Sequence, residues 1–330
     1  MIIQVGLFIL GLVSLTIGAD WLVTGTSSFA EKRGVSPLML GLTVVAFGTS
    51  APELVVSITA VLQNQEGLAV GNVMGSTIAN VGLIVGLGAL IRPIVVHRRL
   101  IEREGPLLIL VLAIVVLLSW NEALGRLDGL ALMTGFAIYL ASLVRWGLKD
   151  ENRINSAAFR LEEKAAPGPA ALPDHPAPPE DTRSWRIPPI PRIIAGLVLL
   201  LVGGHWLVES AVAGARYYHV SEEIIGATVV AVGTSIPELA STVAAAVRRL
   251  GDIAVGNVIG SNIFNLGLVL GTAAMIKPLP LSPTTVGREV IPALIFSVAL
   301  LPLAYSGSRI TRVEGVMLLI GYGLFIVWLI

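Results

Sequence analysis

A six-residue sequence that occurs twice sets the strongest constraint on this chain. Gly-Thr-Ser-Ala-Pro-Glu at 48–53 returns as Gly-Thr-Ser-Ile-Pro-Glu at 233–238, 185 residues later. The similarity extends around both copies, because residues 41–91 and 226–276 align without a gap and share 26 of 51 residues. Apolar helices can resemble one another by chance, but here the shared residues are polar and stand in the same order. The chain therefore consists of two related halves.

Each copy of the sequence carries a glutamate, Glu53 or Glu238, within a segment that is otherwise apolar. A carboxylate inside a membrane span is expensive, so it is rarely kept for packing alone. The proline just before it removes a backbone donor, and Gly, Thr and Ser loosen the preceding turn. We expect a broken helix in each half, with freed carbonyls and hydroxyls that face a cavity instead of lipid. Two such helices are typical of a transporter's ion site at the bilayer midplane.

The composition places the chain in a membrane. Hydrophobic residues make up 55% and charged residues 13% of the sequence, and the mean hydropathy is +0.84. A soluble domain carries about 25% charged residues. The formal net charge is zero, which argues against a nucleic-acid partner. The chain has no cysteine, so disulfides, thiolate metal sites and a catalytic cysteine are excluded.

Apolar runs of the length that a bilayer requires predict ten transmembrane helices. They lie at about 2–29, 36–63, 68–90, 105–120, 127–147, 192–217, 221–248, 252–276, 287–305 and 313–330. Each half has five spans, an odd number, so the second half must lie upside down relative to the first. We expect an all-α integral membrane protein with ten transmembrane helices in two inverted five-helix repeats, an architecture that many secondary transporters share.

A change of composition separates the two repeats. Residues 149–190 hold eight prolines and many charges without an apolar period. Such a segment is typical of a flexible or disordered linker. We therefore expect a first five-helix repeat at 1–148, a Pro-rich linker at 149–190 and a second five-helix repeat at 191–330.

Basic residues concentrate on one side of the predicted topology. With the N-terminus outside, the inner loops and the linker hold 18 of the 22 Lys and Arg residues. The outer side keeps Arg126, Arg216, Lys277 and Arg288. This distribution satisfies the positive-inside rule. We expect a multi-pass protein of the cell inner (plasma) membrane, with both termini outside and the linker cytoplasmic.

A second repeated motif follows each glutamate. It reads GNVMGSTIAN in the first half, where it ends at Asn80, and GNVIGSNIFN in the second half, where it ends at Asn265. Ser76 and Asn80 are four residues apart and project from one helical face, and Ser261 and Asn265 do likewise. Side chains of this kind often serve only as hydrogen bonds between helices. That alternative stays open, above all for the first asparagine of each motif.

Together the two motifs offer two carboxylates, hydroxyls, amide oxygens and backbone carbonyls. Every donor is oxygen, and neither motif contains His or Cys, so zinc, copper and iron are poor fits. Roughly six to eight flexible oxygens with about two negative charges suit calcium, whereas magnesium demands stricter octahedral geometry. The residues therefore favour a calcium site.

The duplicated pattern, GTSAPE with GNVMGSTIAN and GTSIPE with GNVIGSNIFN, closely resembles the alpha repeats of the cation/calcium exchanger superfamily. It is most similar to the prokaryotic sodium/calcium exchangers and the related potassium-dependent branch, and the resemblance covers essentially all ten predicted spans. It implies that Glu53 and Glu238 are the central calcium ligands. It also implies flanking sodium sites shaped by Ser50, Ser235, Ser76 and Ser261, backbone carbonyls from Thr49, Thr234, Ala46 and Ala231, and a side-chain oxygen from Asn80.

Two departures from the superfamily's patterns bear on the counter-ion. Asn265 stands where several members, including potassium-dependent ones, carry an Asp. The site then has two carboxylates and a neutral amide at Asn265, which argues against potassium dependence. The proton-coupled branch usually has a Glu after the Gly-Asn pair, where this chain has Val73 and Val258. This difference favours sodium over protons.

We therefore expect a secondary active antiporter, not an enzyme, that exports calcium in exchange for sodium by alternating access. No cofactor and no obligate protein partner are expected beyond the transported calcium and sodium ions and the lipid bilayer. The resemblance implies that the first and sixth helices slide across a core of the second, third, seventh and eighth. Two alternatives stay open, a calcium/proton antiporter and a calcium-selective channel, since rings of Glu also select cations.

Overall fold

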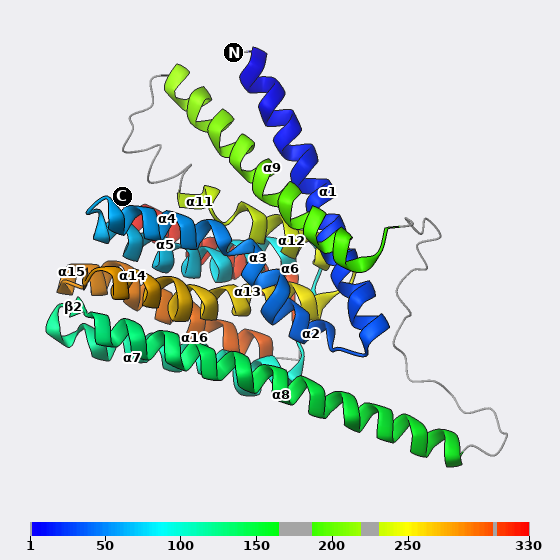
Figure 1. Ribbon diagram of the computed structural model, residues 1–330. Coiled ribbons are helices and arrows are strands. Elements are labelled where there is room, and N and C mark those ends of the chain that lie inside the picture. Colours follow the sequence, from blue (N-terminus) through cyan, green and yellow to red (C-terminus); the bar gives the residue numbers. More distant parts are fainter. Residues whose placement is uncertain (1, 165–186, 219–230, 306–308, 330) are drawn as a thin grey trace.

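The computed structural model describes residues 2–164, 187–218, 231–305 and 309–329, most of which are helical (Figure 1). The helical segments of the first half are α1 (Ile2–Arg33), α2 (Pro37–Leu40), η1 (Gly41–Val45), α3 (Ala46–Thr49), α4 (Ala51–Leu62), α5 (Glu66–Ala79), η2 (Asn80–Val85), α6 (Gly86–Ile91), η3 (Leu100–Glu104), α7 (Gly105–Leu118), η4 (Ser119–Asn121) and α8 (Arg126–Lys164). Those of the second half are α9 (Pro189–Tyr217), α11 (Ala231–Gly233), α12 (Ile236–Val247), α13 (Gly251–Phe264), η6 (Asn265–Val269), α14 (Leu270–Ile276), α15 (Pro283–Thr285), η7 (Val286–Val290), α16 (Ile291–Tyr305) and α17 (Arg312–Leu329).

The described helices agree with the expected membrane architecture. Seven are long and apolar enough to cross a membrane, or eight when the bent pair Pro37–Thr49 and Ala51–Leu62 is taken as one span. Shorter helical segments, α7 and α12, lie at the remaining predicted positions. The expected class of an all-α integral membrane protein is confirmed, and the arrangement is consistent with ten transmembrane helices. The first part of the predicted span 221–248 lies outside the described residues.

The helix α8 continues beyond the fifth predicted span to Lys164, into the first part of the predicted linker (Figure 1). The sequence of this extension is rich in Ala, Glu, Arg and Lys, which have high helix propensity. The prolines that can stop a helix begin only at Pro167. Charged residues are compatible with a helix that extends beyond a membrane span. Residues 165–186 of the linker lie outside the described residues.

Two short strand pairs join the halves at opposite ends of the bundle. Ile94–Val95 (β1) pairs antiparallel with Arg309–Ile310 (β4), and Ala123–Leu124 (β2) pairs antiparallel with Leu279–Pro280 (β3). Each pair takes one strand from each half. The loops that they connect are those that the predicted topology assigns to the same side of the membrane, so the alternation of the spans is consistent between the halves.

Equivalent helices of the two halves pack directly on each other. A Cβ atom added to Gly11 would lie 2.9 Å from the carbonyl oxygen of Gly203, and one added to Gly18 would lie 2.8 Å from that of Gly196. These small residues let the backbones of α1 and α9 approach closely. The contacts run in opposite order along the two helices, so α1 and α9 are antiparallel. Because α1 and α9 occupy equivalent places in the repeat, their opposite directions agree with an inverted repeat.

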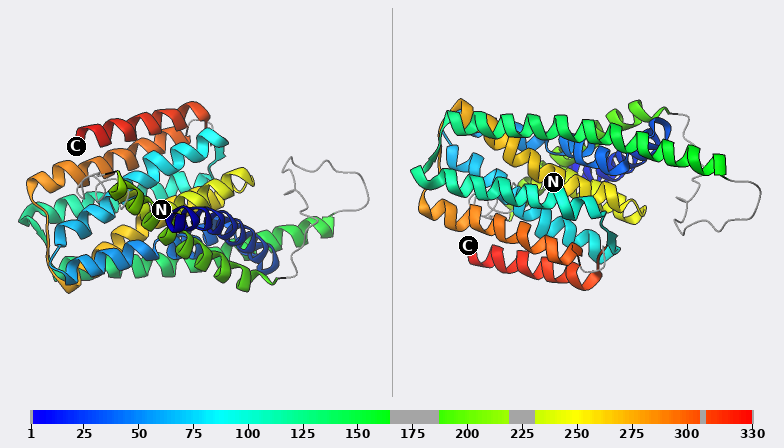
Figure 2. Two further views of the ribbon diagram at one scale, coloured as in Figure 1. Left: turned by 90° about the horizontal axis from the view of Figure 1, so that it is seen from above. Right: turned by 90° about the horizontal axis from the view of Figure 1, so that it is seen from below.

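Figures 1 and 2 show that α1 and α9 lie side by side and cross the remaining helices, which run roughly parallel to one another. The centre of this bundle is formed by the helices that carry the second motif. In the span Gly251–Ile276, 94% of the most apolar window is buried, and in Glu66–Ile91 the share is 72%. The corresponding share in Arg312–Leu329 is 11%. The motif helices are therefore the core, and α17 lies at the periphery.

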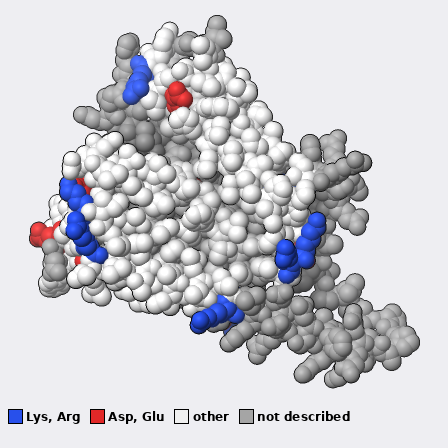
Figure 3. Space-filling view, in the orientation of Figure 1, with Lys and Arg blue, Asp and Glu red and all other residues white. Residues whose placement is uncertain are grey.

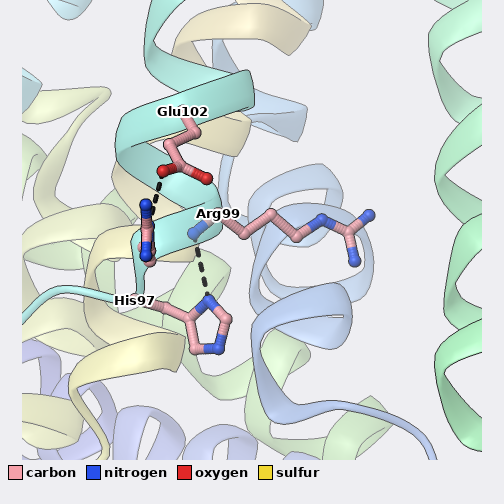
Figure 4. A network of polar contacts seen from close by, with 4 residues as sticks. His97, Arg99 and Glu102 are labelled. Carbon is pink, nitrogen blue, oxygen red and sulfur yellow. Dashed lines mark hydrogen bonds and ion pairs between the residues drawn. The ribbon is translucent and has the colours of Figure 1, made fainter. Parts of the chain in front are cut away.

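The surface separates charge from apolar area. In Figure 3 the Lys, Arg, Asp and Glu side chains of the visible face lie near its margins, and a broad uncharged area lies between them. At the start of η3, the amide of Arg99 donates to Nδ1 of His97 over 3.2 Å and Nε of Arg98 donates to Glu102 over 2.5 Å (Figure 4). An uncharged band between charged ends is the surface that a bilayer requires.

The strand pairs predict a specific cross-link. The chain has no native cysteine, and Val95 and Arg309 are directly opposite in the β1–β4 register. Directly opposite residues of antiparallel strands have Cα atoms about 4.5–5.5 Å apart, within the range of a disulfide, about 4.4–6.8 Å. The variant Val95→Cys with Arg309→Cys should therefore form a disulfide on mild oxidation, detected by altered gel mobility.

The matched control is Ala123→Cys with Arg309→Cys, which joins loops expected at opposite ends of the bundle and should stay reduced. Equal cross-linking of the two pairs would contradict the described register.

Candidate ion-binding site

Both glutamate-bearing helices break just before the glutamate. The chain bends by 43° between Pro37–Thr49 and Ala51–Leu62. At the break Ser50 has φ −83° and ψ 6°, and Ser235 has nearly the same backbone, with φ −90° and ψ 7°. The proline two residues later lacks an N–H group and cannot continue the hydrogen-bond ladder. The predicted helix break is thus present in the described part of both halves.

The break leaves specific carbonyls available. Outside the hydrogen bonds of the helices themselves, the carbonyls of Thr49 and Thr234 accept no backbone hydrogen bond from the described residues. The carbonyl of Ala46 instead accepts from the amide of Ser50 over 3.0 Å and from the hydroxyl of Thr49 over 3.4 Å. Its second half equivalent, Ala231, begins α11 directly after residues that are not described.

The two glutamates are fully buried and each is bound by the other half. Oγ of Ser50 donates to Oε1 of Glu238 over 3.1 Å, and Oγ of Ser235 donates to Oε1 of Glu53 over 3.3 Å. Both carboxylates have an exposed fraction of 0%, and no described Lys, Arg or His forms an ion pair with them. Each glutamate lies in the first turn of α4 or α12, where the helix dipole favours negative charge.

In the first half, Asn72 fixes the backbone of the glutamate. Its Nδ2 donates to the carbonyl oxygen of Glu53 over 3.2 Å and to Oγ of Ser57 over 2.9 Å. Its Oδ1 accepts from the hydroxyl of Thr234 over 3.4 Å. Asn72 therefore links α5 to α4 of its own half and to the helix break of the other half.

Asn257 makes the equivalent contacts in the second half. Its Nδ2 donates to the carbonyl oxygen of Glu238 over 3.4 Å and lies within 3.0 and 3.1 Å of the hydroxyls of Ser241 and Thr242. Its Oδ1 accepts from the hydroxyl of Thr49 over 3.1 Å. For both asparagines, the alternative of hydrogen bonds between helices is therefore the one that the contacts support.

The remaining motif residues are less symmetric. Oγ of Ser76 donates to Oε1 of Glu53 over 3.4 Å, whereas Oγ of the equivalent Ser261 has no partner among the described residues. Nδ2 of Asn80 donates to Oδ1 of Asn262 over 2.8 Å. Asn265 is buried and neither its oxygen nor its nitrogen has a described partner. Asn80 and Asn265 begin the π-helical turns η2 and η6, which are frequent at functional sites.

Several buried polar atoms around the glutamates lack a hydrogen-bond partner in the described part of the chain. They are Oε2 of Glu53, Oε2 of Glu238, Oδ1 of Asn80, Oγ of Ser261, and Oδ1 and Nδ2 of Asn265. Buried polar groups are nearly always satisfied, so a cluster of unsatisfied oxygens requires an explanation. Carboxylate, amide and hydroxyl oxygens together form the ligand set of a hard cation. Among the described residues no group of three or more His, Cys, Asp or Glu is gathered elsewhere for a metal.

Hydrogen bonds join Ser50, Ser76 and Ser235 to the two glutamates, whereas Ser261 and Asn265 have no partner among the described residues. The structure also adds residues that the sequence did not single out. These additions are Ser57, Ser241, Thr242 and Asn262, all of which are polar and belong to the repeated segments. Their signal in the sequence was weak, because isolated Ser, Thr and Asn side chains are common in membrane helices. Of Ala231 only the backbone is described.

Three further polar residues of the predicted spans form ion pairs away from the glutamates. Nε of Arg248 donates to Oδ1 of Asp20 over 2.6 Å, which links α1 to the end of α12. His205 and Glu209 lie 3.6 Å apart on the exposed side of α9. These contacts support a structural role for the three residues.

Comparison with known proteins identifies the family. Residues 3–145 and 190–330 match the family described as sodium/calcium exchanger protein. The chain belongs to the sodium/calcium exchanger family. The match leaves out residues 146–189.

Several known proteins resemble this chain along nearly its whole length. It is 34% identical over 338 residues to the sodium/calcium exchanger MaX1 of Methanosarcina acetivorans, covering 97% of each chain. It is 35% identical over 332 residues to the inner membrane protein YrbG of Escherichia coli, covering 100% of this chain and 96% of YrbG. A solved structure of the sodium-calcium exchanger NCX_Mj superposes with a TM-score of 0.81 at 32% identity, covering 100% of this chain and 99% of NCX_Mj.

The candidate site can be tested by changing each buried glutamate to glutamine and comparing the result with the same change at an exposed glutamate. Glu53→Gln and Glu238→Gln each remove one of two buried charges but keep an oxygen that the serine hydroxyl can bind. Each should weaken calcium binding to the purified protein by about tenfold or more, equal to about 1.4 kcal/mol, as measured by calorimetry. Thermal stability without ions should not fall, because a buried charge without a protein cation is itself destabilising.

Glu102→Gln is the control, since this glutamate pairs with Arg98 at an exposed position and surface pairs contribute little. If both Glu53→Gln and Glu238→Gln kept the wild-type affinity for calcium, the two glutamates would not be calcium ligands.

Proposed function

We propose that this chain is a secondary active antiporter that exports calcium in exchange for sodium by alternating access. The observation that carries the proposal is the reciprocal pairing of the halves at Glu53 and Glu238, where each carboxylate is bound by a serine of the opposite repeat. One ion site is thereby built from both inverted repeats. Such a site at the repeat interface is the common arrangement in secondary transporters.

Calcium is the substrate that fits the charge of the site. Two buried carboxylates are neutralised by one divalent cation, and the unpartnered Oε2 atoms of Glu53 and Glu238 supply oxygen ligands. The carbonyls of Thr49 and Thr234 and the amide of Asn80 would add neutral oxygens beside them. Ligands of this kind, flexible and drawn from several helices, favour calcium over magnesium. The names of the exchanger relatives MaX1 and NCX_Mj are consistent with this choice.

Sodium is the proposed counter-ion because the same oxygens can hold several monovalent cations in place of one divalent cation. Ser50, Ser235, Ser76 and Ser261 flank the carboxylates and would contribute to sodium sites, with Asn265 as an additional amide. A proton-coupled exchanger would be favoured by a further carboxylate after the Gly-Asn pair, where Val73 and Val258 stand. Shared ligands make calcium and sodium binding mutually exclusive, which is the basis of exchange.

Alternating access is proposed to come from movement of α1 and α9 across the core. These two helices pack on each other as a pair and cross the bundle (Figure 1), while α4, α5, α12 and α13 hold the site residues. A pair that is bound mainly to itself can shift without disrupting the hydrogen bonds around the glutamates. The core would then stay fixed while access to it alternates between the two sides.

The proposed orientation places the linker in the cytoplasm and both termini outside. It is supported by the concentration of Lys and Arg in loops on the predicted inner side. The cell inner membrane is the proposed location, in agreement with the name of the relative YrbG. In this orientation the chain moves calcium outward as sodium enters.

The direct test is calcium uptake into proteoliposomes loaded with sodium, potassium or low-pH buffer and diluted into sodium-free medium. We predict rapid uptake of radiolabelled calcium only into the sodium-loaded vesicles, and none with Glu53→Gln. Uptake driven by the pH gradient alone would instead establish a calcium/proton antiporter. Calcium flux that needs no counter-ion gradient would establish a channel.

A further inference from the structure

The amide of Asn80 is held in one orientation. Its side chain is fully buried, and its Nδ2 donates to Oδ1 of Asn262 over 2.8 Å. Its Oδ1 has no partner among the described residues. Ser76 lies one turn earlier on the same helical face and donates to Glu53. Asn80 therefore flanks the site with its oxygen free.

The orientation of Asn262 itself is fixed by the backbone. Nδ2 of Asn262 donates to the carbonyl oxygen of Thr77 over 3.3 Å. A carbonyl oxygen can only accept, so the amide nitrogen of Asn262 must face Thr77 and its Oδ1 must face Asn80. Asn80 must then present its own nitrogen to Asn262. The backbone carbonyl thus determines, through two amides, which atom of Asn80 stays unpaired.

The described part of the second half has no equivalent pair of hydrogen bonds that orients Asn265. Position 262 corresponds to Thr77, whose hydroxyl donates to the carbonyl of Val73 in its own helix. Thr77 therefore has no amide to offer, and Asn265, the counterpart of Asn80, has no described partner on either side-chain atom. Of the equivalent pair Asn80 and Asn265, only Asn80 has its amide oriented by a hydrogen bond among the described residues.

We propose that Asn262 is a positioning residue that fixes Asn80 as an oxygen donor to the transported cation. This inference rests on the proposed cation site. Without Asn262, the amide of Asn80 can turn its N–H group toward the cation, and an N–H group repels a cation. Asn262 thereby adds a contribution of the second half to a ligand that belongs to the first half.

The test compares calcium transport by Asn262→Ala with that of the wild type in sodium-loaded proteoliposomes. We expect the KM for calcium to rise about tenfold, because the amide of Asn80 is no longer held with its oxygen toward the cation. The maximal rate should stay within about twofold, because Asn262 lies behind the ligand. If the alanine variant does not purify as a folded protein, Asn262→Thr replaces it, since threonine is the residue native to the equivalent position.

Thr77→Ala is the matched control. It removes the hydroxyl at the equivalent position of the first half but keeps the carbonyl that anchors Asn262, so the KM for calcium should not change. A second readout is a double-mutant cycle with Asn80→Asp. A carboxylate has an oxygen on both sides, so in that background Asn262→Ala should raise the KM much less than it does in the wild type.

Two results would overturn the inference. One is a wild-type KM in Asn262→Ala or Asn262→Thr, and the other is an equal effect of Asn262→Ala with and without Asn80→Asp. Calorimetry on the wild type and on Glu53→Gln separates these results from a failure of the proposed function. If the wild type binds calcium and Glu53→Gln abolishes that binding, the proposed cation site holds and only the role of Asn262 fails. If the wild type does not bind calcium, the proposed site itself is wrong.

Discussion

The burial of two carboxylates without a protein cation is the constraint on which the rest of the structure depends. Moving an ion into a low-dielectric interior costs several kcal/mol even after relaxation, and Glu53 and Glu238 are both fully buried. Hydrogen bonds to a charged group recover only about 1.5–3 kcal/mol each. The shortfall is what bound cations would supply. The site without a cation is therefore unstable. On the proposed function, the site changes access from one side of the membrane to the other only when calcium or sodium is bound.

The inverted repeat makes this site a joint product of both halves. Ser50 donates a hydrogen bond to Glu238, and Ser235 donates one to Glu53. Asn72 and Asn257 link the backbone of each glutamate to the helix break of the opposite half. Neither half can therefore form its part of the site alone. On the proposed function, these reciprocal contacts would keep the core together while α1 and α9 shift against it.

Much of this arrangement could be predicted from the sequence. The duplicated Pro-Glu pairs predicted the helix breaks, because proline cannot donate and a buried glutamate needs a polar surrounding. The odd number of spans in each half predicted the inversion with which the antiparallel pair α1 and α9 agrees. The family resemblance suggested most of the side chains that lie around the breaks.

The rest depended on tertiary contacts that no local pattern contains. The pairing of Ser50 with Glu238, instead of with Glu53, follows from the packing of one half against the other. In the sequence, Asn262 does not differ from the other polar residues of the motif. Its role depends on its contacts with Asn80 and Thr77. The continuation of α8 to Lys164 could not be predicted from an apolar period, because the charged residues after the fifth span have none.

The most direct test of the central claim is competition between the two ions for the purified protein. Calcium binding would be measured by calorimetry at increasing sodium concentration, with choline replacing sodium to hold the ionic strength constant. We predict one calcium per chain, with an apparent Kd that rises more steeply than the first power of the sodium concentration, because several sodium ions displace one calcium from the same oxygens. A calcium Kd that sodium leaves unchanged would contradict a shared site at Glu53 and Glu238.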